Sequence, residues 1–476
     1  MQQPQAQPAE KFSEKFTDHA VNGVNLTEQT ADFVAAHRTE DVRELALKSK
    51  RVDGLDLPLA LDQIAGWQIA CKKLPQWASC EGIIYPPHIS MEQCSSQFTA
   101  QYKSEIAQTL LTPAVTVRAR MSDSAESDNQ TTKSEPQLSD SGESDTQETK
   151  TGVRVTDSPE SDTLVARSSM VDLTGGFGVD FSYLARGFSQ ATYVERQRHL
   201  CDLAEHNMAA LGLDQARIVC DDGVEYLRQM DPVDFIYLDP ARRDEHGSRT
   251  YAIEDCTPNV LELRDLLLAK SQCTLVKLSP MLDWRKAVAD FDGTVREVHI
   301  VATGNECKEL LLVLSQQVHE EPSAPRVFCV NDNQRIDYDS AAYTQGLRIG
   351  GKPLPETKNY LYEPNASIMK AGCFDLVEER FGVTQVGPSS HLFVSATPVA
   401  DFPGRGFAIE AIGGMNKKDI KRLLNGTKQA NIAVRNFPLT APQLRKKLKL
   451  ADGGPVYLFG TTMQGCDHVL LRTSKI

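Results

Sequence analysis

A glycine-rich turn between two short apolar segments has the residue types and spacing to hold a cofactor. Residues from 168 onward read as a strand that contains Asp172, and a second strand, residues 191–194, runs into Glu195. Glycines let a ligand approach the backbone closely, and an acid at the tip of the next strand can accept hydrogen bonds from both ribose hydroxyls. The sequence therefore predicts a nucleotide-type cofactor site. Its turn consists of Thr174, Gly175, Gly176, Phe177 and Gly178.

The glycine spacing distinguishes two classes of cofactor. A dinucleotide site has the pattern G-x-G-x-x-G, but Gly176 and Gly178 are followed by Val-Asp-Phe, without the third glycine. Asp172 lies inside the first strand, where it would repel a pyrophosphate but suits the ammonium group of S-adenosylmethionine (SAM). The order Asp172-x-x-Gly175-Gly176-x-Gly178 resembles the first motif of class I SAM-dependent methyltransferases. A dinucleotide-dependent enzyme is the disfavoured alternative.

The elements that must position this turn are further strands that end on acids. Apolar runs that alternate with helical stretches predict an α/β fold with a Rossmann-like doubly wound sheet, whose ligands bind beyond the carboxyl ends of the strands. The resemblance implies that Asp221 or Asp222 meets the adenine, although one of the two could instead cap a helix at residues 223–230. The further strands are expected at residues 217–220, 235–238 and 273–278, with a closing hairpin at 295–302 and 309–314.

The receiving side of the reaction is expected after the fourth strand. Methyltransferases that act on base nitrogens use Asp or Asn, then Pro-Pro and an aromatic residue, and Asp239-Pro240 matches the first half of that motif. Ala241-Arg242 replaces the second half, so Arg242 could stack through its guanidinium plane or hold a phosphate. The resemblance implies that Asp239 and the Pro240 carbonyl position the acceptor, and Arg242 is the third candidate catalytic residue. The same D-P-x-R order resembles carbon-5 pyrimidine methyltransferases, which need a nucleophilic cysteine.

Two cysteines are the nearest candidates for that nucleophile, Cys256 and Cys307, and both read more naturally as packing residues.

Other polar residues are expected around the same opening, where Asn305-Glu306 could orient a target or merely cap a turn. They are Lys277, Asp283, Asn305, Glu306 and Lys308.

The N-terminal region reads as a small helical domain. Helical spacing predicts helices at residues 31–50, 59–73 and 90–111, with Trp67 and Trp77 as core anchors. In many class I methyltransferases, a segment before the first strand surrounds the methionine end of SAM. Resemblance to that arrangement nominates four polar residues, with an ordinary helix cap as the alternative. They are Gln93, Ser95, Ser96 and Thr99.

Charge divides the chain more clearly than its net value of −13. Residues 121–163 hold eleven acids against three bases among Ser, Thr and Gln, so disorder is expected there. Residues 405–476 hold thirteen Lys and Arg against four acids, with bases on predicted helices at 416–424 and 442–450. Such a module could bind an RNA backbone, although a solvated helix face explains the charge equally well.

Composition predicts a cytoplasmic enzyme that needs no metal. No run approaches the eighteen or so apolar residues of a membrane span, and the first residues lack a signal-peptide pattern. Eleven cysteines occur without any C-x-x-C pair, which favours reduced thiols over zinc or disulfides.

Several phrases together resemble a bacterial class I SAM-dependent methyltransferase family with ferredoxin-like and THUMP-like C-terminal domains. Membership implies a SAM-dependent enzyme, and we expect a base nitrogen of structured RNA, such as tRNA or rRNA, as its target. A SAM- and RNA-binding protein that has lost catalysis is the main alternative. The phrases are residues 61–66, 84–88, 171–180, 238–243, 254–259, 277–283, 305–310, 360–372 and 432–450.

The resemblance also divides the chain into five parts. A helical domain, 1–120, precedes the acidic insertion, 121–163, and the methyltransferase domain, 164–316. A ferredoxin-like α+β region, 317–402, and a basic THUMP-like domain, 403–476, follow.

Overall fold

The computed structural model describes residues 27–49, 52–86, 88–111, 168–242, 252–316, 324–343, 358–465 and 467–476. The acidic segment 121–163, for which we expect disorder, lies outside these ranges. The chain falls into two compact units. The N-terminal unit holds the first helices with residues 175–193 and 197–219, and the C-terminal unit holds residues 171–174, 194–196 and 220–476.

Helices make up the first part of the N-terminal unit. Helices are expected at 31–50 and 90–111 as single elements, and this is wrong in both cases because a polar side chain begins a new helix inside each range. Asp41 accepts the backbone N–H groups of Arg43 and Glu44, and Ser96 Oγ accepts that of Thr99. The helices are α1 (Glu28–His37), α2 (Val42–Lys48), α3 (Leu57–Lys73), α4 (Pro75–Ser79), α5 (His88–Gln93) and α6 (Gln97–Leu111).

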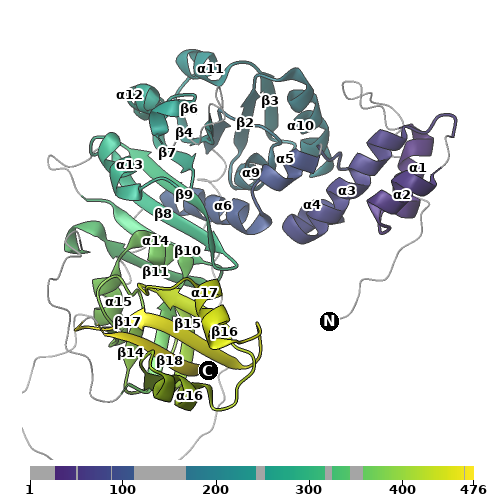
Figure 1. Ribbon diagram of the computed structural model, residues 1–476. Helices are drawn as coiled ribbons and strands as arrows, with labels where there is room; N and C mark the ends of the chain where they lie inside the picture. Colours follow the sequence, from purple (N-terminus) through teal and green to yellow (C-terminus); the bar gives the residue numbers. More distant parts are fainter. Residues whose placement is uncertain are drawn as a thin grey trace, which may run out of the picture. The chain divides into compact units, whose positions relative to one another are not determined.

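One large sheet carries the predicted doubly wound core, and it confirms the expected fold class (Figure 1). Its nine strands run in the order β11-β10-β8-β9-β7-β4-β1-β2-β3. Strand β4 pairs in parallel with β7, whereas β9 is antiparallel to both β7 and β8 and forms the closing hairpin. The strands are β1 (Ser169–Asp172), β2 (Gln190–Glu195), β3 (Ala216–Cys220), β4 (Val233–Leu238), β7 (Ser271–Leu278), β8 (Val295–Thr303), β9 (Glu306–Ser315), β10 (Arg326–Asn331) and β11 (Gln334–Asp339).

The hairpin of β10 and β11 extends this sheet, although the sequence assigns residues 317–402 to a ferredoxin-like region. Strand β10 pairs in parallel with β8, and its buried residues Val327, Cys329 and Val330 continue the core of the sheet. The sequence does not predict that β10 joins this sheet, because the residues of a short apolar strand do not indicate which sheet it pairs with.

Helices connect the strands, and a small ladder follows β4. Residues 235–238 of β4 are almost completely buried, as expected of a central parallel strand. The ladder consists of β5 (Ala241–Arg242) and β6 (Cys256–Thr257). The helices are α9 (Val179–Leu184), η2 (Ala185–Gly187), α10 (Arg198–Ala210), α11 (Gly223–Gln229), η3 (Ile253–Asp255), α12 (Val260–Lys270) and α13 (Trp284–Asp290).

Side-chain hydrogen bonds fix the first helices within the N-terminal unit. Trp77 is buried, and its indole N–H donates to Ser182 Oγ over 3.1 Å, which confirms it as a core anchor. The Asn207 side chain pairs with both backbone groups of Ile84, each over 2.9 Å. Trp67 is only half-buried, with Arg38 stacked 4.9 Å from its ring centre, so it is not a core residue.

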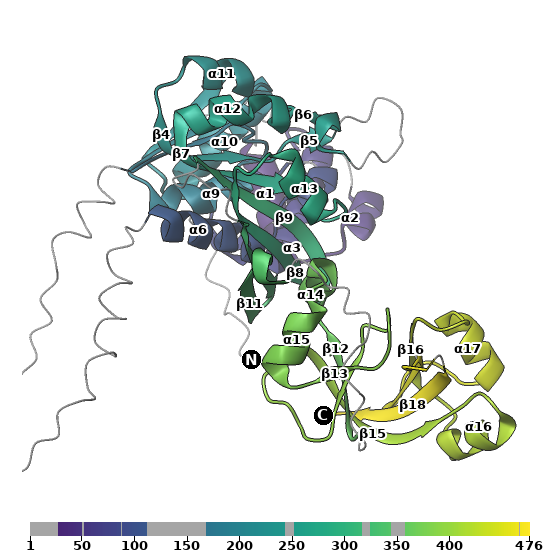
Figure 2. The ribbon, with the colours of Figure 1, turned by 90° about the vertical axis from the view of Figure 1, so that its left-hand side faces the viewer.

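The C-terminal region builds a second sheet, of seven strands in the order β13-β14-β12-β15-β18-β17-β16. Helices α16 and α17 pack on one face through Leu423, Leu444 and Leu448 (Figure 2). The elements are η4 (Ser340–Tyr343), β12 (Tyr360–Pro364), α14 (Ala366–Ala371), α15 (Phe374–Phe381), β13 (Thr384–Gln385), β14 (Phe393–Ser395), β15 (Gly404–Gly413), α16 (Lys417–Leu424), β16 (Asn431–Arg435), α17 (Ala441–Leu448), β17 (Val456–Thr462) and β18 (His468–Lys475).

Apolar residues also fill the other face of this sheet. Leu361, Phe407, Phe459 and Leu471 form a core there, beneath the segment that carries Val386 and Leu392. Within the described ranges, no helix is long and apolar enough to cross a membrane.

Candidate active site

The ends of four neighbouring strands bring the predicted acids together in the C-terminal unit. Asp172 ends β1, Glu195 ends β2, Asp221 follows β3 and Asp239 follows β4. Backbone hydrogen bonds hold these ends in pairs, since the Leu173 N–H donates to the Tyr237 carbonyl and the Asp221 N–H donates to that of Glu195, both over 3.1 Å. The order β4-β1-β2-β3 therefore places four carboxylates along one edge of the sheet.

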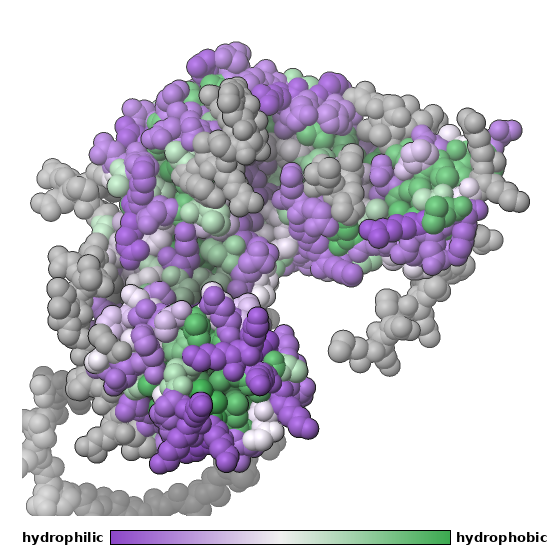
Figure 3. Space-filling view, in the orientation of Figure 1, coloured by the Kyte–Doolittle hydropathy of each residue, from purple (hydrophilic) through white to green (hydrophobic). Residues whose placement is uncertain are grey.

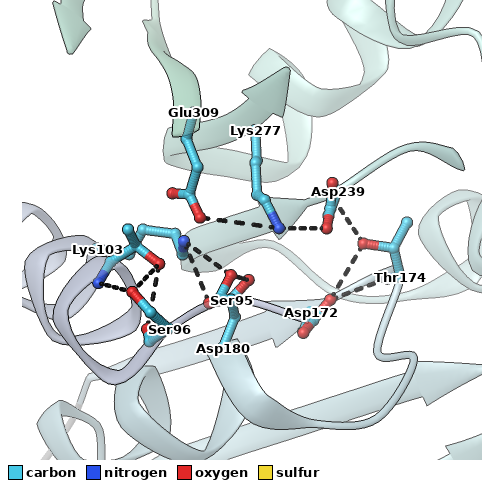
Figure 4. Close-up of polar contacts among 10 residues, drawn as sticks. Ser95, Ser96, Lys103, Asp172, Thr174, Asp180, Asp239, Lys277 and Glu309 are labelled. Atoms are coloured by element: carbon cyan, nitrogen blue, oxygen red, sulfur yellow. Dashed lines mark hydrogen bonds and ion pairs between the residues drawn. The ribbon is translucent and has the colours of Figure 1, made fainter. Parts of the chain in front are cut away.

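Thr174 connects the first of these acids with the last (Figure 4). Asp172 is buried, and its Oδ1 accepts the Thr174 backbone N–H over 2.9 Å and the hydroxyl over 3.4 Å. The same hydroxyl oxygen accepts the Asp239 backbone N–H over 2.7 Å. Thr174, expected only as a cofactor-binding residue, thus fixes the turn at Asp239 against β1.

A lysine between two carboxylates completes this edge. Lys277 Nζ lies 2.7 Å from Asp239 Oδ2 and 4.0 Å from Glu309 Oε1 (Figure 4). The Glu309 side chain is only 5% exposed and that of Lys277 15%, whereas that of Asp239 is 41% exposed. The three side chains carry a net charge of −1, and Asp239 is the member that a ligand can reach.

Glu309 is a site residue that the sequence analysis missed. It precedes the apolar run of β9, where an isolated acid is the only signal. Register explains its position, because Lys277 lies opposite Leu311 in the antiparallel β7–β9 pair, and Glu309, two residues away, shares that face.

The glycine turn has a backbone that requires glycine. A Cβ on Gly175 would lie 2.2 Å from the Tyr193 ring, and the Tyr193 hydroxyl donates to the Gly176 carbonyl. Gly176 and Gly178 have φ of 52° and 73°, and Gly178 is the N-cap residue of α9. Phe177 is half-buried and packs on Ile84 and Leu203 rather than pointing freely outward.

Asp221 and Asp222 have different roles in the structure. Asp222 caps α11 by accepting the backbone N–H groups of Val224 and Glu225, which is the structural role that the sequence left open for one of them. Asp221 is exposed, and its carboxylate accepts the N–H of Asp222 and otherwise faces solvent beside the half-buried Glu195.

Ser95 belongs to a buried ion pair in the N-terminal unit. Lys103, which is completely buried, lies 3.2 Å from Asp180 Oδ1 and donates to Ser95 Oγ over 3.2 Å, while Ser95 donates to Asp180 Oδ2 over 2.9 Å (Figure 4). Asp180 is in the first turn of α9, immediately after the glycine turn. The network therefore fixes the first turn of α9 to α6 and to the segment before it, and sequence reasoning missed Lys103.

The other residues nominated near the methionine end of SAM lie around the start of α6. Ser96 and Thr99 form its first-turn hydrogen bonds, since Ser96 Oγ accepts the Thr99 N–H and the Thr99 hydroxyl donates to the Ser96 carbonyl. Gln93 is exposed at the end of α5. Helix capping accounts for Ser96 and Thr99 here, and cofactor binding by all four residues stays a prediction.

The motif after β4 continues into the small ladder. Pro240 is buried, and Ala241 and Arg242 pair with Thr257 and Cys256. The sequence motif therefore lies on a short antiparallel pair instead of an open loop.

Neither candidate cysteine nucleophile is favoured by its surroundings. Cys256 is buried, with its thiol directed at the Ala252 carbonyl. Burial raises the pKa of Cys307 to about 11, so that thiol is protonated near neutral pH.

Only Lys277 among the five residues expected around the opening contacts Asp239. Asp283 caps α13, and Glu306 pairs with Lys308 over 2.6 Å at the surface. Asn305 has φ of 63°, and its Oδ1 accepts the N–H of Ala366, the first residue of α14, over 2.9 Å. The expected positions of these four residues around the opening stay a prediction. In the described part of the chain, no group of three His, Cys, Asp or Glu residues could hold a metal ion.

Comparisons with known proteins agree with this architecture. A ferredoxin-like domain family matches residues 360–403, and a THUMP domain-like family matches residues 404–475. The crystal structure of a "putative methyltransferase" from Porphyromonas gingivalis W83 superimposes with a TM-score of 0.72 at 29% identity, covering 94% of this chain and 97% of that one. No curated protein matches the chain.

Another solved structure covers less of the chain. A SAM-dependent methyltransferase from Agrobacterium tumefaciens is 17% identical, with a TM-score of 0.24, and covers 32% of this chain and 56% of its own. The chain therefore shares its fold with a "putative methyltransferase" over nearly its whole length and ends in ferredoxin-like and THUMP-like domains.

Proposed function

We propose that the protein is a SAM-dependent methyltransferase that modifies a base nitrogen of structured RNA, such as tRNA or rRNA. One observation carries the proposal. The bridge from Asp172 through Thr174 to Asp239 joins a buried carboxylate suited to an ammonium group with an accessible carboxylate suited to an acceptor.

The residues around β1 and β2 fit SAM. Asp172 can hold the ammonium group, and Glu195 the ribose hydroxyls. Asp221 is free of the helix-capping role of Asp222 and can meet the adenine. Gly175, Gly176 and Gly178 leave the turn without side chains where the donor would pass. When bound, SAM supplies an electrophilic methyl group.

The receiving side fits an acceptor that carries hydrogen on nitrogen. A net charge of −1 over Asp239, Lys277 and Glu309 disfavours a phosphate or carboxylate acceptor and favours a group that donates hydrogen bonds. Methylation of an amino nitrogen adds positive charge there, which the Asp239 carboxylate would stabilise before accepting the proton. The Pro240 carbonyl would accept a second hydrogen bond, and the residues would mainly align donor and acceptor.

RNA is the acceptor that the charge of the C-terminal domain favours. Residues 405–476 contain thirteen basic residues and only four acids. Hydrophilic residues cover the region of α16 and α17 in Figure 3. Exposed bases on these helices could contact phosphates without reading sequence. They include Lys417, Lys418, Lys421, Lys446 and Lys447. Such a substrate implies a cytoplasmic enzyme.

Calorimetry and nucleoside analysis test this proposal. The protein should bind SAM but not NAD, and a missing methylated nucleoside in RNA from cells without the gene would identify the target. Asp239→Ala should abolish transfer and leave SAM affinity nearly unchanged. An absence of SAM binding would refute the proposal.

Two other results would support the alternatives. SAM and RNA binding without any transfer would favour a protein that has lost catalysis, for which the Ala241-Arg242 departure speaks. Loss of transfer in Cys256→Ser or Cys307→Ser alone would favour carbon-5 methylation of a pyrimidine.

A further inference from the structure

A buried glutamate in the C-terminal sheet holds two arginines at once. Glu363 Oε2 accepts hydrogen bonds from Arg405 Nε, over 3.0 Å, and from Arg405 Nη2, while its Oε1 accepts one from Arg435 Nη2 over 2.7 Å. The Glu363 side chain is 4% exposed, whereas those of Arg405 and Arg435 are 46% and 38% exposed. One carboxylate therefore fixes two guanidinium groups at the surface, with a net charge of +1.

The two arginines come from distant strands of the same sheet. Arg405 lies directly opposite Glu363 in the β12–β15 pair, but three strands stand between β12 and β16, which carries Arg435. Alternation places Glu363 and Arg405 on the face of Leu361 and Phe407. Contact with Arg435 therefore requires the sheet to curl around this core.

Polar groups beside the cluster lack partners. Arg435 Nε is buried, and so is the hydroxyl of Thr461, the register partner of Arg435 on β17. Among the described residues, neither atom has a hydrogen-bond acceptor or donor within reach. Unsatisfied buried polar atoms are uncommon in native proteins and call for a ligand, a water or a strained site.

Strained backbone surrounds the same point. Ser389, His391 and Asn436 all have positive φ, from 47° to 55°, although none is glycine. Asn436 Nδ2 donates to the Pro388 carbonyl over 2.8 Å, which joins the two turns. Burial and the charge of nearby Arg435 lower the pKa of His391, so its ring is neutral beside the arginines. Non-glycine residues in this conformation concentrate at ligand sites.

We propose that Arg405 and Arg435, held by Glu363, form a clamp for a backbone phosphate of RNA. The inference rests on the proposed RNA substrate and names the residues that would hold it. Planar guanidinium groups bind phosphate through paired N–H donors, and their fixation by Glu363 reduces the conformational entropy lost on binding.

A purely structural ion pair predicts different behaviour. In that case, the cluster only ties β12 to β15 and β16, and its loss lowers stability without changing RNA affinity beyond the effect of one surface charge. In the clamp, geometry matters as well as charge, so lysine cannot replace arginine.

Binding of end-labelled bulk bacterial tRNA to the full chain, measured by anisotropy across a salt series, separates the two. Arg405→Gln and Arg435→Gln should each weaken binding about tenfold and reduce the salt slope by about one. Arg435→Lys should lose most of the same affinity at unchanged charge. Arg326→Gln is the matched control, because Arg326 is an exposed arginine of β10 that pairs with Asp337 of β11.

Three results would overturn the clamp: no tRNA binding by the wild type, losses no larger than that of Arg326→Gln, or full affinity in Arg435→Lys. Melting temperatures show which variants are unfolded. If a glutamine variant is unfolded, the corresponding lysine variant, Arg405→Lys or Arg435→Lys, is used in its place. SAM affinity, by calorimetry, and methyl transfer are measured on the same proteins. If the protein neither binds SAM nor transfers methyl groups, but the arginine variants still bind tRNA more weakly, the proposed enzymatic function is refuted and the phosphate clamp is supported.

Discussion

Replacing Gly175 with alanine tests the steric basis of the glycine turn. The added Cβ would lie 2.2 Å, 2.5 Å and 2.5 Å from three carbons of the Tyr193 ring. Carbon atoms in contact normally stay about 3.5–4.0 Å apart, so ring and turn must separate by more than about 1 Å. Tyr193 cannot yield easily, because it is buried, donates its hydroxyl to Gly176 and packs edge-on against Phe181 at 5.6 Å.

Overpacking of this kind costs about 1–3 kcal/mol of unfolding free energy. For a domain of 150–250 residues, each kcal/mol corresponds to roughly 2–4 °C of melting temperature, which differential scanning calorimetry resolves. SAM affinity, measured by titration calorimetry, should fall more than about tenfold because the turn itself is displaced. Gly187→Ala is the matched control, since its Cβ meets only the flexible Gln108 side chain at 3.3 Å.

A double-mutant cycle with Tyr193→Ala completes the test. Removing the ring makes room for the methyl group, so Gly175→Ala should cost almost nothing in that background, with a coupling of about 1–3 kcal/mol. An equal cost in both backgrounds, or a wild-type melting temperature for Gly175→Ala, would refute the steric explanation.

Two further predictions concern the receiving side. Lys277→Met should slow methyl transfer to RNA at least about tenfold, because Asp239 and Glu309 then repel each other without a cation between them, and Lys277→Arg should recover part of the rate. Radiolabelled transfer measures both, and equal rates would contradict the role of Lys277. Cys307 should resist iodoacetamide at pH 8 and react only as the pH approaches its pKa of about 11, and Cys307→Ser should keep full transfer; peptide mass spectrometry and the transfer assay check this.

The sequence was sufficient for the strand ends but not for what joins them. Parallel strands place their carboxyl ends at one edge, so the sequence alone predicts Asp172, Glu195, Asp221 and Asp239 at the same edge of the sheet. Glu309 could not, because its approach to Lys277 depends on the β7–β9 register, which leaves no trace in composition.

Contacts between distant segments set the same limit elsewhere. Arg435 meets Glu363 across 72 residues and three intervening strands, and only the curvature of the sheet makes that contact. The prediction of one continuous helix over residues 31–50 was wrong because Asp41 caps the N-terminus of a second helix, α2, inside that range.

Thr174 has a consequence for cooperativity. Its hydroxyl touches the carboxylate expected to hold the donor and also holds the backbone of Asp239. A donor that draws Asp172 toward its ammonium group would therefore adjust the acceptor strand through a single oxygen. Donor and acceptor should then change each other's affinity by the same factor. Thr174→Val would break the link and make the two affinities independent.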